Sequence, residues 1–174
     1  MPGIAEFKPL DIALLTLSDT RTRENDTSGD ALEELLTGAG HRLVARELCK
    51  DNIYQTRAIV SRWIADPAIH VVITTGGTGL TNRDSTPEAL IPLFDQVIDG
   101  FGELFRQVSY EEIGSSTVQS RCCAGLANKT LVFCLPGSTG ACRTGWNRIL
   151  AEQLDSRHQP CNFVGLTALG GGQH

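Results

Sequence analysis

A strand, a glycine loop and the start of a helix follow one another between His70 and Leu90. The sequence there is HVVITTGGTGLTNRDSTPEAL, with a β-branched run, three glycines in four positions and a Thr-Pro-Glu helix start. This order is the building unit of a parallel sheet, in which ligands bind beyond the carboxyl ends of the strands. Asp84 lies between the glycines and the helix. The stretch therefore predicts an α/β fold with a loop that binds phosphate.

The rest of the chain repeats this alternation of strand and helix. Short apolar runs predict strands at 11–17, 42–48, 71–75 and 129–135. Capping residues and apolar stripes predict helices at about 27–39, 53–65, 87–94, 101–113 and 142–154. Strands that alternate with helices imply a largely parallel sheet covered on both faces. Segment 115–127 is too polar for a core strand and too rich in glycine and serine for a firm helix assignment, so it stays unassigned.

Length and charge limit the class of protein. The 174 residues suit one domain, with a core at about 7–163 and a mobile tail at 165–174. A net charge of -5 argues against a nucleic-acid surface. No apolar stretch reaches the 18 or so residues of a membrane span, and the first residues do not resemble a secretion signal. We therefore expect a cytoplasmic protein that contacts neither membrane nor nucleic acid.

The cysteines and histidines give no sign of a structural metal or a disulfide framework. The six cysteines contain no C-x-x-C pair, and a domain of this size does not need disulfides. The four histidines show no zinc-ligand spacing. Free and mostly buried thiols are the expectation.

Four loops follow predicted strands and should meet at one edge of the sheet. They contain Ser18-Asp19, Asp51-Asn52, the segment 76–84 and the turn 136–140. Their hydroxyls, glycine amides and carboxylates are groups that bind or activate phosphate. Asp51 and Asp84 together could hold Mg²⁺ bridged to a nucleotide phosphate.

Each of these residues also has an ordinary structural explanation. The glycines suit a tight turn with positive φ, and Ser138, Thr139 and Asp51 are residue types that cap helices. Asp26 is expected to cap the helix that follows it. Three arginines flank the loops, and they either clamp phosphate or are simply solvated: Arg21, Arg23 and Arg83.

Segments along most of the chain carry a family resemblance. From about Phe7 to Phe163 the chain resembles the molybdenum-cofactor biosynthesis family that includes the MogA and MoaB proteins, most closely its MoaB branch. The matching segments are TLSDTR, DTSGDALEELL, TTGGTGLTNRDSTPEAL, GFGELFRQVSYEEIGSSTVQSR, AGLANKTLVFCLPGS and ACRTGWNRIL. The resemblance implies a three-layer α/β/α molybdopterin-binding domain that assembles as a homo-trimer or homo-hexamer.

The resemblance also implies a reaction and a set of site residues. The reaction is Mg²⁺-dependent adenylylation of molybdopterin by ATP, with release of pyrophosphate. Gly76, Gly77, Thr78 and Gly79 match the loop that receives the nucleotide, and Asp51 and Asp84 match the two functional acids, which also hold the metal. The residues that match the molybdopterin side are Ser18, Asp19, Gly137, Ser138 and Thr139.

Two alternatives stay open at this stage. One is a non-catalytic molybdopterin-binding or scaffold protein of the same pathway, and the other is a nucleotide-binding regulatory domain. Asp51 keeps the acid of the adenylyltransferase pattern, whereas Leu80 stands where the MogA branch commonly has proline. An enzyme needs both acids near a metal-bound nucleotide, but a binding protein needs only the glycine loop and the Ser138-Thr139 donors.

Overall fold

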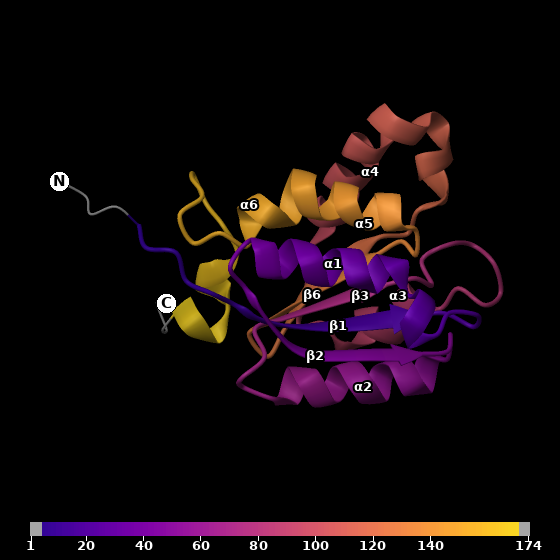
Figure 1. Cartoon of the computed structure of the whole chain (residues 1–174), viewed down its shortest axis with the longest axis horizontal. Helices are drawn as coiled ribbons and strands as arrows, with labels where there is room; N and C mark the ends of the chain where they lie inside the picture. The colour runs from indigo at the N-terminus through magenta and orange to yellow at the C-terminus, as the bar shows by residue number, and fades with distance from the viewer. Residues whose placement is uncertain (1–4, 171–174) are drawn as a thin grey trace.

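One six-stranded sheet lies between two layers of helices in the computed structural model, which describes residues 5–170 (Figure 1). The strands are Asp11–Leu17 (β1), Arg42–Cys49 (β2), Val71–Thr75 (β3), Gln96–Val97 (β4), Cys123–Ala127 (β5) and Thr130–Leu135 (β6). Their order is β2-β1-β3-β6-β5-β4. The first four run parallel, β5 is antiparallel to β6, and β4 is antiparallel to β5. The predicted three-layer α/β fold with a mostly parallel sheet is confirmed.

The helices fall close to their predicted positions. They are Thr27–Gly38 (α1), Ile53–Ala65 (α2), Thr86–Leu90 (α3), Asp99–Ile113 (α4), Thr139–Gly145 (α5) and Ala151–Gln153 (α6). A π-helical turn, Trp146–Leu150, joins α5 to α6. Short 3-10 helices occupy Arg23–Asn25 (η1), Ile91–Leu93 (η2), Gly114–Gln119 (η3), Val164–Leu166 (η5) and Ala168–Gly170 (η6). The helix expected at 87–94 thus ends at Leu90 and continues as a 3-10 turn that contains Pro92.

Two hydrophobic layers hold the helices on the sheet. Consecutive residues of a strand point to opposite faces, so Leu14 and Leu15 of β1 pack into different layers. On the first face, Leu32 of α1 and Phe105 of α4 belong to one buried cluster. On the second face, Trp63 of α2 belongs to the other. Figure 1 shows α1, α4 and α5 on one side of the sheet and α2 on the other.

The segment left unassigned, 115–127, contains two different structures. Its first part lies in η3, and its last part is the antiparallel strand β5. A tight turn at Asn128 and Lys129, with φ of 49° and 62°, joins β5 to β6. The expected strand at 129–135 therefore begins one residue later, at Thr130. This hairpin begins the antiparallel part of the sheet, which ends at the edge strand β4.

The structure bears on the C-terminal tail and on membrane-spanning helices. In the tail expected to be mobile, residues 165–166 belong to η5 and residues 168–170 form η6, whereas 171–174 lie outside the described residues. Among residues 5–170, no helix combines the length and the apolar character that a membrane crossing requires.

Candidate active site at the carboxyl edge of the sheet

The loops after β1, β2, β3 and β6 surround a cavity of about 540 Å³. It lies at the carboxyl ends of parallel strands, where α/β sheets bind their ligands. Side chains of α4, including Phe105 and Ser109, close another side. Ten of the predicted site residues line the cavity: Ser18, Asp19, Asp51, Gly76, Gly77, Thr78, Gly79, Asp84, Gly137 and Ser138.

Thr139 is the predicted site residue that the structure does not place on the cavity wall. Its hydroxyl lies 2.9 Å from the Thr27 hydroxyl and 3.3 Å from the Ser28 hydroxyl, so it joins α5 to α1. Ser138 caps α5, because its hydroxyl oxygen accepts a hydrogen bond from the Ala141 amide at 3.1 Å. The capping role expected for Ser138 is confirmed, and it is compatible with a place on the cavity wall.

The glycine loop has a conformation that other residues rarely adopt. Gly76 and Gly77 have φ of 104° and 71°. A Cβ at Gly76 would collide with the Leu17 carbonyl, and one at Gly77 would collide with the Thr86 hydroxyl. Thr86 fixes the loop, since its hydroxyl donates to the Gly76 carbonyl at 2.8 Å and its amide donates to the Gly77 carbonyl at 3.0 Å. The tight-turn explanation therefore holds for both glycines, and the turn brings their backbone close to the acids of the site.

Asp51 does not cap the helix that follows it. The Asn52 side chain caps α2 instead, accepting from the amides of Tyr54 and Gln55 at 2.9 and 3.0 Å. Asp51 Oδ1 is buried and has no hydrogen-bond partner among the described residues. Burial raises the pKa of this carboxyl, and the charges of Asp19 and Asp84 raise it further. A carboxylate oxygen in this position requires a cation or a proton.

Asp84 lines the same cavity in a different electrostatic state. Burial raises its pKa, but hydrogen bonds from the Thr81 hydroxyl, the Thr81 amide and the Gly79 amide outweigh burial and hold the pKa below its ordinary value. The two Thr81 bonds to Asp84 Oδ2 measure 2.7 and 3.0 Å. Asp84 is therefore ionised at neutral pH and adds negative charge beside Asp51.

These two carboxylates suit a Mg²⁺ ion that is also bound by substrate phosphates, rather than a metal site built from protein ligands alone. Within residues 5–170 there is no group of three or more histidine, cysteine, aspartate or glutamate side chains arranged to hold a metal. Mg²⁺ is commonly bound by one or two carboxylates together with substrate phosphates. The unpartnered Oδ1 of Asp51 is a suitable oxygen ligand for such an ion.

The comparisons with known proteins identify the family of the chain. The family model MoCF_biosynth, described as a probable molybdopterin binding domain, matches residues 13–156. The chain belongs to this family. It is 57% identical over 158 residues to molybdenum cofactor biosynthesis protein B of Escherichia coli (strain K12), covering 91% of this chain and 93% of that one. The MoaB/MogA resemblance is confirmed, and the relatives support a role in molybdenum cofactor biosynthesis.

Solved structures of MoCF_biosynth relatives share the fold. A crystal structure of a molybdenum cofactor biosynthesis protein B is 44% identical, with a TM-score of 0.82 and coverage of 84% of this chain and 92% of that one. The tungsten cofactor synthesizing protein MoaB from Pyrococcus furiosus is 36% identical, with a TM-score of 0.74 and coverage of 83% and 92%.

Arg83, one of the three candidate phosphate clamps, is occupied by protein groups in this MoCF_biosynth domain. Its guanidinium donates to both Asp19 carboxylate oxygens at 2.7 and 2.9 Å and to the Asp51 carbonyl at 3.0 Å. The Arg83 hydrogen bonds also hold the pKa of Asp19 below its ordinary value. Asp19 Oδ1 in turn accepts from the Asp51 amide at 3.2 Å. Asp19 and Arg83 thus fix the backbone from which Asp51 points into the cavity.

Sequence reasoning missed Arg121, which lies in the unassigned segment. Its amide donates to the Thr78 carbonyl at 2.9 Å, and its guanidinium donates to the carbonyls of Gly79 and Asp84 at 2.8 and 3.2 Å. Glu88 forms an ion pair with the same guanidinium. Arg121 therefore holds both ends of the loop 79–84. A lone arginine in a polar segment carries no sequence signal for this role.

Proposed function

We propose that this protein catalyses ATP- and Mg²⁺-dependent adenylylation of molybdopterin, a step of molybdenum cofactor biosynthesis. In this reaction an oxygen of the pterin's terminal phosphate attacks the α-phosphorus of ATP. A new P–O bond forms, the bond between the α-phosphorus and the bridging oxygen breaks, and pyrophosphate leaves. The observation that carries the proposal is the buried, unpartnered Oδ1 of Asp51, which lies beside a glycine loop in a cavity shared with Asp84.

Each part of the cavity has a role in this proposal. Backbone amides of the loop Gly76–Gly79 would receive the nucleotide phosphates, because glycine turns present amides to anions. Asp51 and Asp84 would hold Mg²⁺, which supplies positive charge to the phosphates when bound. The turn with Gly137 and Ser138 borders the same cavity next to Gly76, and the pterin would lie against this turn. Little covalent chemistry is required of the protein, since phosphoryl transfer depends mainly on positioning and charge.

Leu80 does not remove any of these groups. Its side chain is 66% exposed and is not part of the cavity wall described by the structure. The glycine amides and Asp84 keep their positions around it through Thr81, Thr86 and Arg121. The substitution of leucine for the proline common in the MogA branch therefore leaves the proposed donors in place.

Turnover with purified components tests the proposal. The protein is mixed with molybdopterin, Mg²⁺ and ATP, and both pyrophosphate release and the adenylylated pterin are measured. We expect product from the wild type, none above background from Asp84→Ala, and wild-type rates from Asp99→Ala, which removes an exposed carboxylate of α4. Wild-type product no higher than that of Asp84→Ala would overturn the enzyme and favour a non-catalytic molybdopterin-binding protein.

We also propose that the chain assembles as a homo-trimer or homo-hexamer. Large apolar side chains are exposed along α4 and η3, including Leu104 (42%), Tyr110 (62%), Ile113 (54%) and Val118 (76%). Exposed apolar side chains that are concentrated in one part of a protein commonly mark a protein interface, and these four come from α4 and the 3-10 helix that follows it. Light scattering at micromolar concentration should return a mass of three or six chains of 18.8 kDa each, and a monomer would contradict this assembly.

A cytoplasmic location suits the proposed reaction, because the cytoplasm supplies ATP and keeps thiols reduced. All six cysteines are free in the structure. Three are buried, two are partly buried, and Cys161 is exposed. Fractionation of cells that express the protein would test the location, which we expect to be the soluble cytoplasmic fraction.

A further inference from the structure

The charges around the cavity are unevenly distributed. Three carboxylates line it, from Asp19, Asp51 and Asp84, and Arg21 is the one basic side chain that the described residues contribute to its wall. The proposed reaction brings together two anionic substrates, ATP and a phosphate monoester. Because negative charges dominate the wall, binding of two anions requires cations close to their phosphates. The position of Arg21 therefore determines where an anion can bind.

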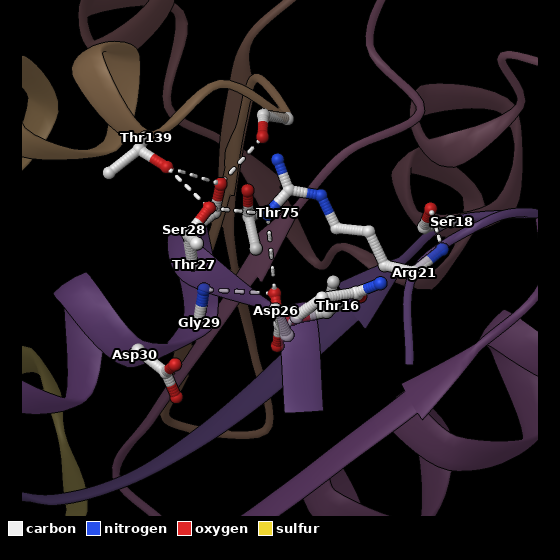
Figure 2. A network of polar contacts seen from close by, with 12 residues as sticks. Thr16, Ser18, Arg21, Asp26, Thr27, Ser28, Gly29, Asp30, Thr75 and Thr139 are labelled. Carbon is white, nitrogen blue, oxygen red and sulfur yellow. Dashed lines mark hydrogen bonds and ion pairs between the residues drawn. The ribbon is translucent and has the colours of Figure 1, made fainter. Parts of the chain in front are cut away.

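Arg21 is held in place from both ends. Its amide donates to the Ser18 hydroxyl at 3.0 Å, and its guanidinium Nη1 donates to the Thr27 hydroxyl at 2.8 Å. Figure 2 shows the side chain extending from the Ser18 loop toward the hydroxyls of Thr27 and Thr139. The side chain is 30% exposed, and Arg21 is one of the residues that line the cavity.

Arg21 has one carboxylate nearby, that of Asp26, and the two form an ion pair without a hydrogen bond. Asp26 Oδ1 lies 3.9 Å from Arg21 Nη1, beyond hydrogen-bond distance. Arg46 binds Asp26 more closely, since its Nη2 lies 3.0 Å from Asp26 Oδ2. The second oxygen of Asp26 also accepts from the Gly29 amide at 3.1 Å (Figure 2). Asp26 thus orients the Arg21 guanidinium at a distance without a direct hydrogen bond.

The other two candidate phosphate clamps differ from Arg21 in this respect. Arg83 is bound by both oxygens of Asp19. Arg23 pairs with Asp30 at 2.9 Å and with Glu33 at 3.5 Å, and it does not line the cavity. The structure therefore separates three arginines that the sequence could not rank. A guanidinium has five N–H donors. Within the described chain, the Arg21 guanidinium forms only one hydrogen bond to a protein group.

We propose that Arg21 binds the phosphate monoester of the acceptor pterin. This inference rests on the proposed function, since it assigns the acceptor half of the same cavity. The nucleotide phosphates have the glycine amides and the metal held by Asp51 and Asp84, whereas the acceptor phosphate has no other cationic side chain on the wall. A guanidinium can bind two phosphate oxygens at once, which fixes the direction of the attacking oxygen as well as its charge.

Equilibrium binding of molybdopterin, without ATP, tests this assignment. The variants are Arg21→Gln, which removes the charge, and Arg21→Lys, which keeps the charge but loses the planar fork. Arg23→Gln is the matched control, because it removes a neighbouring arginine that lies outside the cavity wall. Each protein is titrated with molybdopterin, with enzymatically dephosphorylated molybdopterin, and separately with MgATP. Unfolding curves establish that each variant is folded.

We expect Arg21→Gln to weaken molybdopterin binding by about tenfold or more, the usual scale for a charge-assisted hydrogen bond. Arg21→Lys should lose less, and Arg23→Gln should bind like the wild type. Against the dephosphorylated pterin, Arg21→Gln should match the wild type within about twofold, because the group that Arg21 binds is gone. MgATP affinity should stay unchanged in all variants.

Three results would overturn the assignment: equal affinity of Arg21→Gln and wild type for molybdopterin, an equal loss with and without the phosphate, or a loss of MgATP affinity alone. The binding assay needs no turnover, so it separates this inference from the proposed function. Arg21-dependent binding without adenylylation would reject the enzyme and keep the assignment. Full adenylylation by Arg21→Gln with unchanged pterin affinity would reject the assignment of Arg21 and keep the proposed enzyme activity.

Discussion

Asp26 and Asp51 are two carboxylates at the carboxyl edge of the same sheet, and their surroundings differ completely. Asp26 is 1% exposed and accepts hydrogen bonds from the Thr16 hydroxyl at 2.7 Å, from the Gly29 amide at 3.1 Å, which Figure 2 shows, and from Arg46 at 3.0 Å. Asp51 has a buried oxygen with no partner in the described chain. Both carboxylates are desolvated, but only the first is compensated by the protein itself.

This difference separates a structural carboxylate from one prepared for a ligand. A buried polar group without a partner costs free energy, so folding does not favour it. The region around Asp26 uses its charge to join β1, α1 and β2, since Thr16, Gly29 and Arg46 come from these three elements. The region around Asp51 provides no partner for the buried oxygen, so a ligand from outside the chain is needed to neutralise its charge. Variants of Asp26 should therefore lose stability, whereas variants of Asp51 should lose activity.

The largest effect is expected from Asp26→Ala, on stability. The change leaves Arg46, whose side chain is 6% exposed, without its most buried partner. Removing one member of a buried ion pair typically costs about 3–5 kcal/mol. Urea unfolding should show this loss in the free energy of unfolding. Asp30→Ala removes an Arg46 partner that is 53% exposed and should cost no more than about 1 kcal/mol. Equal losses in the two variants would contradict the structural role of Asp26.

Asp51→Asn should lower turnover while the protein stays folded. The amide keeps the shape of the side chain but removes the charge that would hold Mg²⁺. We expect the adenylylation rate to fall by about 100- to 1,000-fold, the scale seen when one group that stabilises the transition state is lost. Steady-state kinetics at saturating Mg²⁺ measure the effect, with Asp99→Asn as the matched exposed control. A rate within about threefold of the wild type would remove Asp51 from the metal site.

The difference between the two aspartates was only partly predictable from the sequence. Periodicity and caps predicted four of the six strands, the main helices and the cap at Asp26, because these depend on residues close together in the chain, whereas β4 and β5 were not predicted. The same local rules left the role of Asp51 undecided between cap and ligand. The decision depends on Asn52 as the actual cap and on Arg83 and Asp19, which are brought together only by the fold.

The segment 115–127 shows the same limit for the fold. Strand β5 reads CAGLA and lies between β6 and the edge strand β4, where Gly125 packs against Phe94. A Cβ at Gly125 would collide with the Phe94 ring, so glycine is required by a contact 31 positions away. Local periodicity cannot indicate such a strand. Arg121 lies two residues before the start of β5, and its role in the loop was missed for the same reason.

Arg121→Met tests whether the loop 79–84 must be held in place for ligand binding, because the substitution loosens this loop without changing Asp51 or Asp84. The bonds to the carbonyls of Gly79 and Asp84 are lost, so the loop 79–84 becomes more mobile. We expect MgATP affinity to fall by about tenfold, or about 1.4 kcal/mol. Glu88→Gln removes the ion-pair partner of Arg121 but keeps both carbonyl bonds, and it should lose less than about threefold. Equal losses would assign the effect to the ion pair rather than to the loop.

The smallest expected effect is a gain in stability from Asp51→Asn in metal-free protein. The ionised Asp51 is disfavoured by burial and by the nearby charges of Asp19 and Asp84. A neutral amide avoids this penalty, so the free energy of unfolding should rise by about 1 kcal/mol at pH 8, the scale for one poorly satisfied buried group. Excess Mg²⁺ should narrow the gap, since binding stabilises the folded wild type alone.

The pH dependence of this gain has a definite sign. The pKa of Asp51 in the folded protein is raised above its ordinary value of 3.8, so the folded wild type binds a proton more readily than the unfolded chain does. The penalty is therefore fully present above the raised pKa, shrinks as the pH falls through it, and is absent below 3.8. Unfolding of wild type and Asp51→Asn from pH 8 down to below pH 3.8 should show the two stabilities converging toward acid. A gap that widens toward acid would mean that Asp51 has a partner in the folded protein, and Asp51 would then belong with Asp26 as a structural carboxylate.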